Sequence, residues 1–319
     1  GEGRFLDDLE PVARAGHAAI VRSQLPHARI SVDASAALEA PGVIGVLTGD
    51  DVLALSHPFP AGIDSPAKQY ALAIDTVRYV GEPIAVVVAR DRYLAEDAAE
   101  LVLVDYEPLE PVLDFERAET VHKTCGIDKG DVAAAFAGAA RVVEGAYRVG
   151  HQEHAYIEPN GMVAWPRIDG VRLVRGSLQC PFYVHAALVR LFGEPAEAIR
   201  VAQTSTGGGF GGKEDYPDLV AGHAALLARA CGKAVKIVYE RQEDIIATTK
   251  RHPSRVRHRT GVKRDGTLVA MDIDVLLDKG GLERLRRRVL GRGYVEKFPG
   301  SRGLRDSEHG VDIDVVLAG

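Results

Sequence analysis

Cysteine is scarce in this chain, and its scarcity excludes several kinds of site. Only three cysteines, Cys125, Cys180 and Cys231, occur among 319 residues, and no two of them form a C-x-x-C pair. A cysteine-ligated iron–sulfur cluster or zinc site within the chain is therefore excluded. An odd, sparse count is typical of buried thiols in a reducing compartment, so we expect a cytoplasmic protein.

Long hydrophobic runs and an excess of positive charge are also missing. The longest apolar run, Ile84–Ala89, has the length of a buried strand and falls far short of the ~18 residues of a membrane span. The formal net charge is −6 at pH 7. We therefore expect neither a membrane nor a nucleic acid as partner. Because the chain begins at Gly1 rather than Met, the absence of a signal peptide carries little weight.

The composition is that of an ordinary globular protein. The chain is 46% hydrophobic and 26% charged, and its length suggests two domains or three small ones. Short strands and helices alternate in the first part. The clearest unit there is a strand at Ile84–Ala89, a helix at Arg92–Leu101 and a strand at Val102–Tyr106. Asp91 is placed to cap the helix, and the whole pattern predicts an α+β fold.

Two amphipathic helices are expected in the second half of the chain. The first spans Pro181–Phe192 and ends at Gly193. The second begins at Pro217, with Asp215 as a plausible cap, and ends before Gly232.

The stretch "HQEHAYIEP" contains two histidines, but it does not predict a metal site. Neither H-E-x-x-H nor H-x-x-E-H is present. At strand spacing, His154, Tyr156 and Glu158 would share one face. His151 and His154 would then lie on opposite faces, where one zinc ion could not use both, so a structural role is favoured.

A hairpin is expected over residues 254–278, because Asp265 and Gly266 form a strong two-residue turn. The turn would set the register so that Arg259 faces Asp272. Cross-strand pairs of this kind explain most of the basic run "KRHPSRVRHR" without nucleic acid.

The glycine-rich stretch "STGGGFGGKED", Ser205–Asp215, fits two phosphate motifs on paper. A P-loop needs Ser or Thr after its lysine, but Glu214 and a second carboxylate follow Lys213 and would repel a triphosphate. A dinucleotide fingerprint needs the helix to begin inside the glycines, and Pro217 places the helix start well after them. Two interpretations remain. The loop is either a nest of backbone N–H groups close to a large ligand, or a tight glycine turn without one.

Several separate stretches carry a family resemblance, in the same order along the chain. They are "RYVGEPIAVVVARDRYLAEDAAELVLVDYEPL", "QEHAYIEP", "GGGFGGKE" and "TTKRHPSRVRHRTGVKRDGTLVAMDID". Together they resemble the amino-terminal portion of the molybdenum-binding large subunit of the xanthine dehydrogenase/aldehyde oxidase family, of xanthine dehydrogenase type. The resemblance implies an α/β hammerhead domain at residues 1–120, a linker at 121–142 and the first part of a molybdopterin-binding domain at 143–281. Residues 282–319 form a tail without this resemblance, and because it lacks a clear hydrophobic period we expect it to be loosely packed.

The resemblance also implies where the molybdopterin cofactor binds. The backbone N–H of Phe210 would bond a molybdenum oxo group. Gly208, Gly209 and Gly211 would line the pterin, in its plain or its cytosine dinucleotide form. Gln179, in "GSLQCP", matches a glutamine that bonds a molybdenum ligand, and no protein atom would ligate the metal directly.

Glu214 matches the substrate-binding position of the family. A glutamate there orients the heterocycle in purine-hydroxylating members, whereas aldehyde oxidases tend to carry an apolar residue. The resemblance thus implies oxidative hydroxylation of a purine or a related small N-heterocycle. Electrons would leave through [2Fe-2S] clusters and FAD on partner subunits, because the cysteine count excludes such clusters here.

The resemblance stops after "DKGG", because Leu282 follows Gly281 where the family continues with Ala-Tyr and a long further segment. That segment holds the catalytic glutamate, so no catalytic residue is assigned within this chain. We expect the chain alone to be inactive and to require the carboxy-terminal half of the molybdenum domain. Two alternatives stay open: an enzyme subunit that is split or partial, and a non-catalytic or frame-shifted remnant that binds partner subunits without turnover.

Overall fold

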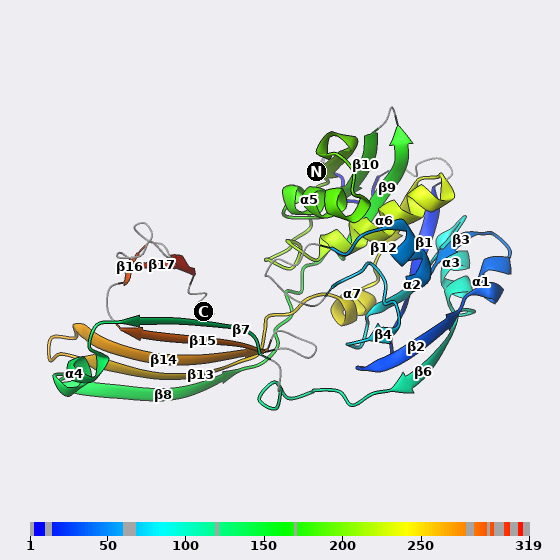
Figure 1. Ribbon diagram of the computed structural model, residues 1–319. Helices are drawn as coiled ribbons and strands as arrows, with labels where there is room; N and C mark the ends of the chain where they lie inside the picture. The colour runs from blue at the N-terminus through cyan, green and yellow to red at the C-terminus, as the bar shows by residue number, and fades with distance from the viewer. Residues whose placement is uncertain are drawn as a thin grey trace. The chain divides into compact units, whose positions relative to one another are not determined.

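The chain forms two compact units, each assembled from two separate stretches (Figure 1). The first unit comprises Gly1–Pro111 with Gln152–Arg251, and the second comprises Val112–His151 with His252–Gly319. The computed structural model describes residues 3–9, 15–59, 68–118, 121–168, 171–278, 284–291, 294–296, 303–306 and 312–314. Helices and mixed sheets both occur, so the expected α+β class is confirmed. In these described ranges no helix is long and apolar enough to cross a membrane.

A seven-stranded sheet is the centre of the first unit, with strand order β11-β10-β9-β12-β1-β5-β3. Its strands are β1 (Gly16–Arg22), β3 (Val43–Leu47), β5 (Pro83–Ala89), β9 (Gly161–Ile168), β10 (Val171–Gly176), β11 (Ile199–Gln203) and β12 (Val235–Val238). Strand β1 runs parallel to β12 and antiparallel to β5. The two stretches of the unit therefore share one continuous sheet.

A small sheet and the helices complete the first unit. The small sheet has the order β4-β2-β6, with β2 at Ala28–Asp33, β4 at Thr76–Val77 and β6 at Leu103–Pro108. The helices are α1 (Ser35–Glu39), α2 (Gly49–Leu55), α3 (Arg92–Ala99), α5 (Pro181–Phe192), α6 (Pro217–Cys231) and α7 (Arg241–Ala247), with a 3-10 turn, η1, at Ala196–Ala198.

The strand–helix–strand unit expected in the first part of the chain is confirmed. Strand β5 is buried along its whole length, as its continuous apolar sequence predicts. Asp91 caps α3, because its Oδ1 accepts a hydrogen bond from the backbone N–H of Leu94 at 3.0 Å. Strand β6 follows the helix.

Both helices expected in the second half are confirmed. Helix α5 ends at Gly193 and α6 ends at Gly232, and both glycines have left-handed backbone conformations that favour glycine. Helix α6 is buried over most of its length and packs on β9 and β12. The expectation that Asp215 caps α6 is wrong. The capping position is Tyr216, which makes no side-chain cap bond, and only the Asp215 carbonyl accepts from the helix, at the N–H of Asp218.

The second unit contains a five-stranded sheet with order β7-β15-β14-β13-β8 and a three-stranded sheet, β16-β17-β18. The strands of the larger sheet are β7 (Val121–Lys129), β8 (Arg141–Val149), β13 (Ser254–Val262), β14 (Leu268–Asp278) and β15 (Arg284–Gly291). Helix α4 (Val132–Ala137) follows β7, and the small sheet is formed by β16 (Tyr294–Glu296), β17 (Gly303–Asp306) and β18 (Asp312–Asp314).

The predicted hairpin is β13 and β14, and its register is confirmed. Arg259 faces Asp272 across the pair. The other neighbour of β13 is β8, where Glu144 accepts a hydrogen bond from Arg259 Nε at 2.6 Å. Acidic partners on both sides thus neutralise the basic run.

Two expectations about irregular segments are wrong. Residues 121–129, expected to begin a linker, form β7, although the short Ala-rich helix expected after them is present as α4. In the tail, residues 284–291 form β15, which pairs with β14 on one side and β7 on the other. Pairing with distant strands supplies the order that these local sequences do not predict. The rest of the tail, apart from β16–β18, lies outside the described residues. The bounds of the hammerhead domain, 1–120, and of the first part of the molybdopterin-binding domain, 143–281, stay predictions.

Candidate functional site

The glycine loop, residues 205–215, joins β11 to α6 and has an unusual backbone. Gly208 and Gly211 have φ values of +96° and +92°, which side chains other than glycine rarely adopt. Phe210 also has a positive φ, of 52°, and the residue is 75% exposed. A positive φ at a bulky residue costs free energy and is found most often where function requires it.

Close packing against the protein explains three other glycines of the loop. A Cβ atom at Gly207 would lie 2.6 Å from Glu158 Cβ, and one at Gly212 would lie 2.7 Å from Tyr156 Cε1. A Cβ atom at Gly209 would clash with Gln179 Oε1. The glycine content therefore reflects the fit of the loop to its own chain as well as any ligand.

Gln179 is held in one orientation by the loop. Its Oε1 accepts hydrogen bonds from the backbone N–H groups of Gly211 at 3.0 Å and Lys213 at 3.1 Å. Because both partners are donors, the atom that faces them must be the oxygen. The Nε2 amide has no partner among the described residues, so Gln179 presents a donor for a further acceptor.

Three consecutive backbone N–H groups of the loop are also unpaired. Among the described residues, the N–H groups of Gly208, Gly209 and Phe210 have no hydrogen-bond partner, whereas Gly207, Gly211, Gly212 and Lys213 all donate. Gly209 is buried, and buried N–H groups without a partner are rare. With the Nε2 of Gln179, these groups form a set of donors without a charged side chain. Such a set fits a large ligand rich in acceptor oxygens, as an oxo-metal centre with a pterin would be.

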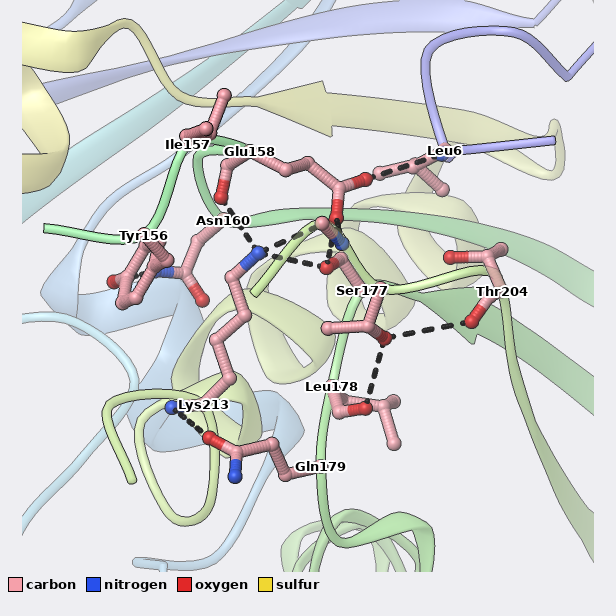
Figure 2. A network of polar contacts seen from close by, with 12 residues as sticks. Leu6, Tyr156, Ile157, Glu158, Asn160, Ser177, Leu178, Gln179, Thr204 and Lys213 are labelled. Carbon is pink, nitrogen blue, oxygen red and sulfur yellow. Dashed lines mark hydrogen bonds and ion pairs between the residues drawn. The ribbon is translucent and has the colours of Figure 1, made fainter. Parts of the chain in front are cut away.

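A buried polar network fixes the loop to the neighbouring segment (Figure 2). Lys213 has a fully buried side chain whose Nζ donates to the Glu158 carbonyl at 2.6 Å and to Ser177 Oγ at 2.8 Å. Burial lowers the pKa of Lys213, and the Glu158 carboxylate, 3.4 Å away, partly offsets this. No motif in the sequence indicates this network. Because its ammonium group is used in this network, Lys213 is not available to bind a phosphate, which agrees with our rejection of the P-loop interpretation.

The expected strand at "HQEHAYIEP" is wrong. The segment is irregular apart from an isolated bridge at Gln152, and Ala155 has a positive φ of 52°. Hydrogen bonds to distant elements set its path instead. Buried Asp244 accepts bonds from the Tyr156 hydroxyl and from the backbone and side chain of Asn160. No group of three or more potential metal ligands was found in the part of the chain that the structure describes.

Glu214 and two further carboxylates form the acidic end of the loop. Glu214 and Asp215 are exposed. Asp218 is partly buried, and burial, with a further contribution from Asp215, raises the pKa of Asp218 to about 7. Burial raises the pKa of the Cys180 thiol, and the negative charge of Glu214 raises it further. Glu214 is thus an exposed carboxylate next to the unpaired donors of the loop.

Two surface hollows lie elsewhere on the described residues. One, of about 400 Å³, lies in the first unit and is lined by ion-paired side chains such as Arg92 and Lys236. The other, of about 690 Å³, lies beside α4 in the second unit. Neither includes a residue of the glycine loop. The loop with its unpaired donors is therefore the better candidate site.

Two known protein-family domains match the chain in consecutive segments. The aldehyde oxidase and xanthine dehydrogenase a/b hammerhead domain matches residues 1–110. The molybdopterin cofactor-binding domain matches residues 115–298, more than half of the chain. The chain belongs to the xanthine dehydrogenase/aldehyde oxidase family of molybdenum hydroxylases. The second match runs past Gly281, where we expected the resemblance to end.

Individual members of the family cover the chain almost completely. Xanthine dehydrogenase of Blastobotrys adeninivorans is 33% identical over 317 residues, which are 95% of this chain and 22% of that enzyme. The nicotinate dehydrogenase large molybdopterin subunit of Eubacterium barkeri is 34% identical over 294 residues, 88% of this chain and 67% of that subunit. The structure of quinoline 2-oxidoreductase from Pseudomonas putida 86 aligns with a TM-score of 0.77 at 27% identity, over 90% of this chain and 42% of that one. The chain thus spans only part of the length of these relatives.

Membership in the family confirms the hammerhead segment and a segment that belongs to the molybdopterin cofactor-binding domain. The roles of Gln179, Phe210 and the loop glycines toward the cofactor, and of Glu214 toward the substrate, stay predictions.

Proposed function

We propose that this chain supplies the cofactor loop and a substrate-orienting carboxylate of a molybdenum hydroxylase of xanthine dehydrogenase type, whose substrate is a purine or a related N-heterocycle. The observation that carries the proposal is the run of unpaired N–H groups at Gly208, Gly209 and Phe210 beside the fixed amide of Gln179. The relatives named above act, by their names, on xanthine, nicotinate and quinoline, all of which contain ring nitrogen.

In this proposal the residues of the chain bind the cofactor and orient the substrate. The Nε2 of Gln179 and the N–H of Phe210 would donate hydrogen bonds to acceptor atoms of the molybdenum cofactor, and the amides of Gly208 and Gly209, with Gly211, would hold its pterin. Molybdopterin, when bound, supplies the metal centre that oxidises the substrate carbon and accepts its electrons. Glu214 bonds ring nitrogens of the heterocycle and stabilises the charge that develops on the ring.

The chain does not act alone in this proposal. Its three cysteines are free thiols, and they are too few for a cysteine-ligated iron–sulfur cluster. Iron–sulfur and FAD subunits therefore carry the electrons away, and a carboxy-terminal half of the molybdenum domain supplies the catalytic base. Free thiols are consistent with a cytoplasmic assembly.

A non-catalytic remnant that binds partner subunits is the alternative. Such a remnant would keep the loop, so geometry alone does not separate the two. The variants described below separate the enzyme subunit from the remnant, because they measure substrate discrimination rather than folding.

The test is Glu214→Ala in the native assembly, assayed with xanthine and with benzaldehyde, which lacks ring nitrogens. Loss of a charge-assisted hydrogen bond worth ~1.5–3 kcal/mol should lower kcat/KM for xanthine by roughly 10–160-fold. Benzaldehyde should lose much less. Asp215→Ala is the matched control, since it removes the adjacent exposed carboxylate and should affect both substrates equally. Equal losses for both substrates in Glu214→Ala would refute the orienting role, and no turnover in the wild-type assembly would favour the remnant.

A further inference from the structure

The carboxylate of Glu158 joins both ends of the glycine loop. Its Oε2 accepts a hydrogen bond from the N–H of Gly207 at 2.7 Å and lies 3.4 Å from Lys213 Nζ. Gly207 precedes the unpaired donors, and Lys213 follows them. One carboxylate therefore fixes the loop on either side of the segment that faces a ligand.

The same carboxylate reaches two further elements. Ser177 Oγ, just after β10, donates to Oε2 at 2.6 Å. The N–H of Leu6 donates to Oε1 at 3.3 Å, and Leu6 itself is buried. Both oxygens of Glu158 are thus used, by elements from three separate parts of the chain (Figure 2).

Lys213 connects this network to Gln179. Its side chain bonds Glu158 and Ser177. Its backbone N–H donates to Gln179 Oε1, and its carbonyl accepts from the Gln179 N–H at 2.7 Å. A displacement of Lys213 would therefore carry Gln179 with it.

We infer that Glu158 is a positioning residue: with Lys213 it closes the glycine loop and determines that Gln179 presents Nε2, rather than Oε1, to the ligand. The inference rests on the proposed function, because the orientation matters only if the loop holds the cofactor. Glu158 itself does not touch the cofactor in this account. Its charge is essential, since an amide whose oxygen stayed against Gly207 and Lys213 would lose the charge that faces the ammonium and would place its NH2 donor against the N–H of Leu6.

The test is amide hydrogen exchange of the complete chain, comparing wild type with Glu158→Gln. Exchange at Gly207, Gly211 and Lys213 should quicken about 10-fold or more, as expected for loss of a charge-assisted bond. Amides of β5 should not change. Glu194→Gln is the matched control, because Glu194 is similarly buried and paired with Arg172 in the same unit, and it should leave the loop amides unchanged.

Ser177→Ala provides a milder second variant in case Glu158→Gln does not fold, and it should produce the same local pattern at about 3-fold or more. Unchanged loop exchange in whichever variants fold would overturn the inference. A rise of equal size in the loop and in β5 would also overturn it, because it would indicate only a general loss of stability.

The link to the cofactor is measured as molybdenum per chain in the native assembly. A lower molybdenum content in Glu158→Gln than in Glu194→Gln supports positioning, and equal contents overturn it. Absence of molybdenum from the wild-type assembly would instead refute the proposed function, while the exchange experiment would still decide whether Glu158 closes the loop.

Discussion

Asp218, in the first turn of α6, is a single residue whose charge the fold disfavours. Burial and the neighbouring Asp215 raise its pKa to about 7, and its Oδ1 has no partner among the described residues. The folded state therefore favours the protonated acid. Stability from this group is fully present below the unfolded pKa of about 4 and is lost as pH rises toward 7.

Replacing Asp218 with Asn should remove this loss. At 1.36 kcal/mol per pKa unit, and after allowing for the favourable helix dipole, Asp218→Asn should stabilise the chain by about 3 kcal/mol at pH 8. Near pH 4 the two proteins should be equally stable. Denaturant unfolding at several pH values checks this, and a difference that does not vary with pH would show that Asp218 titrates normally.

Helix α6 illustrates, at the scale of one element, how packing can outweigh propensity. Gly222 lies inside this helix, and a Cβ atom there would lie 2.5 Å from Phe59 Cζ and 3.3 Å from Leu191 Cδ2. Helix propensity alone predicts that alanine would stabilise the position by ~1 kcal/mol. Overpacking opposes it by ~1–3 kcal/mol.

We expect Gly222→Ala to destabilise the chain by about 1 kcal/mol, because the crowding term exceeds the propensity term. Gly232→Ala is the control, since nothing lies within 4 Å of its Cβ position and only its left-handed backbone, with φ of 62°, resists substitution. Thermal unfolding of both variants measures the difference. A gain of stability in Gly222→Ala would show that α6 does not pack as described.

Elements with local signals were predictable from the sequence, and elements held by distant partners were not. The cap at Asp91, the glycine after α5 and the turn at Gly266 each act within a few residues, and the elements that they predict are present. Strand β7 depends on pairing with β15, far along the chain. No local pattern records such a partner.

The residues of the candidate site also divide into those that a local sequence motif indicates and those that depend on distant partners. The loop and Gln179 were singled out by motifs with a family resemblance. Glu158 and Lys213 were not, because their roles depend on hydrogen bonds between segments that meet only in the fold. Alternation in "HQEHAYIEP" predicted a strand, yet Asp244, from α7, sets the path of this segment.

Across the whole molecule, family segments and compact units do not coincide. The molybdopterin cofactor-binding match, residues 115–298, contributes to both units. The glycine loop, Gln179 and Glu158 all lie in the first unit, on the same sheet system as the hammerhead stretch. Leu6 bonds Glu158, which holds the loop at Gly207, and β1 pairs with β12 in the same sheet, so the hammerhead stretch supports the loop through Glu158 and the shared sheet.

The central claim is that the donors of the glycine loop hold a molybdenum cofactor, and anomalous X-ray scattering at the molybdenum edge tests it most directly. The measurement requires crystals of the assembly isolated from its native cells. The account predicts one molybdenum site per chain, with no protein ligand to the metal, whose oxygen ligands accept hydrogen bonds from Gln179 Nε2 and the N–H of Phe210. Two results would contradict it: molybdenum bound away from residues 208–211, or an assembly with all its subunits present that contains no molybdenum.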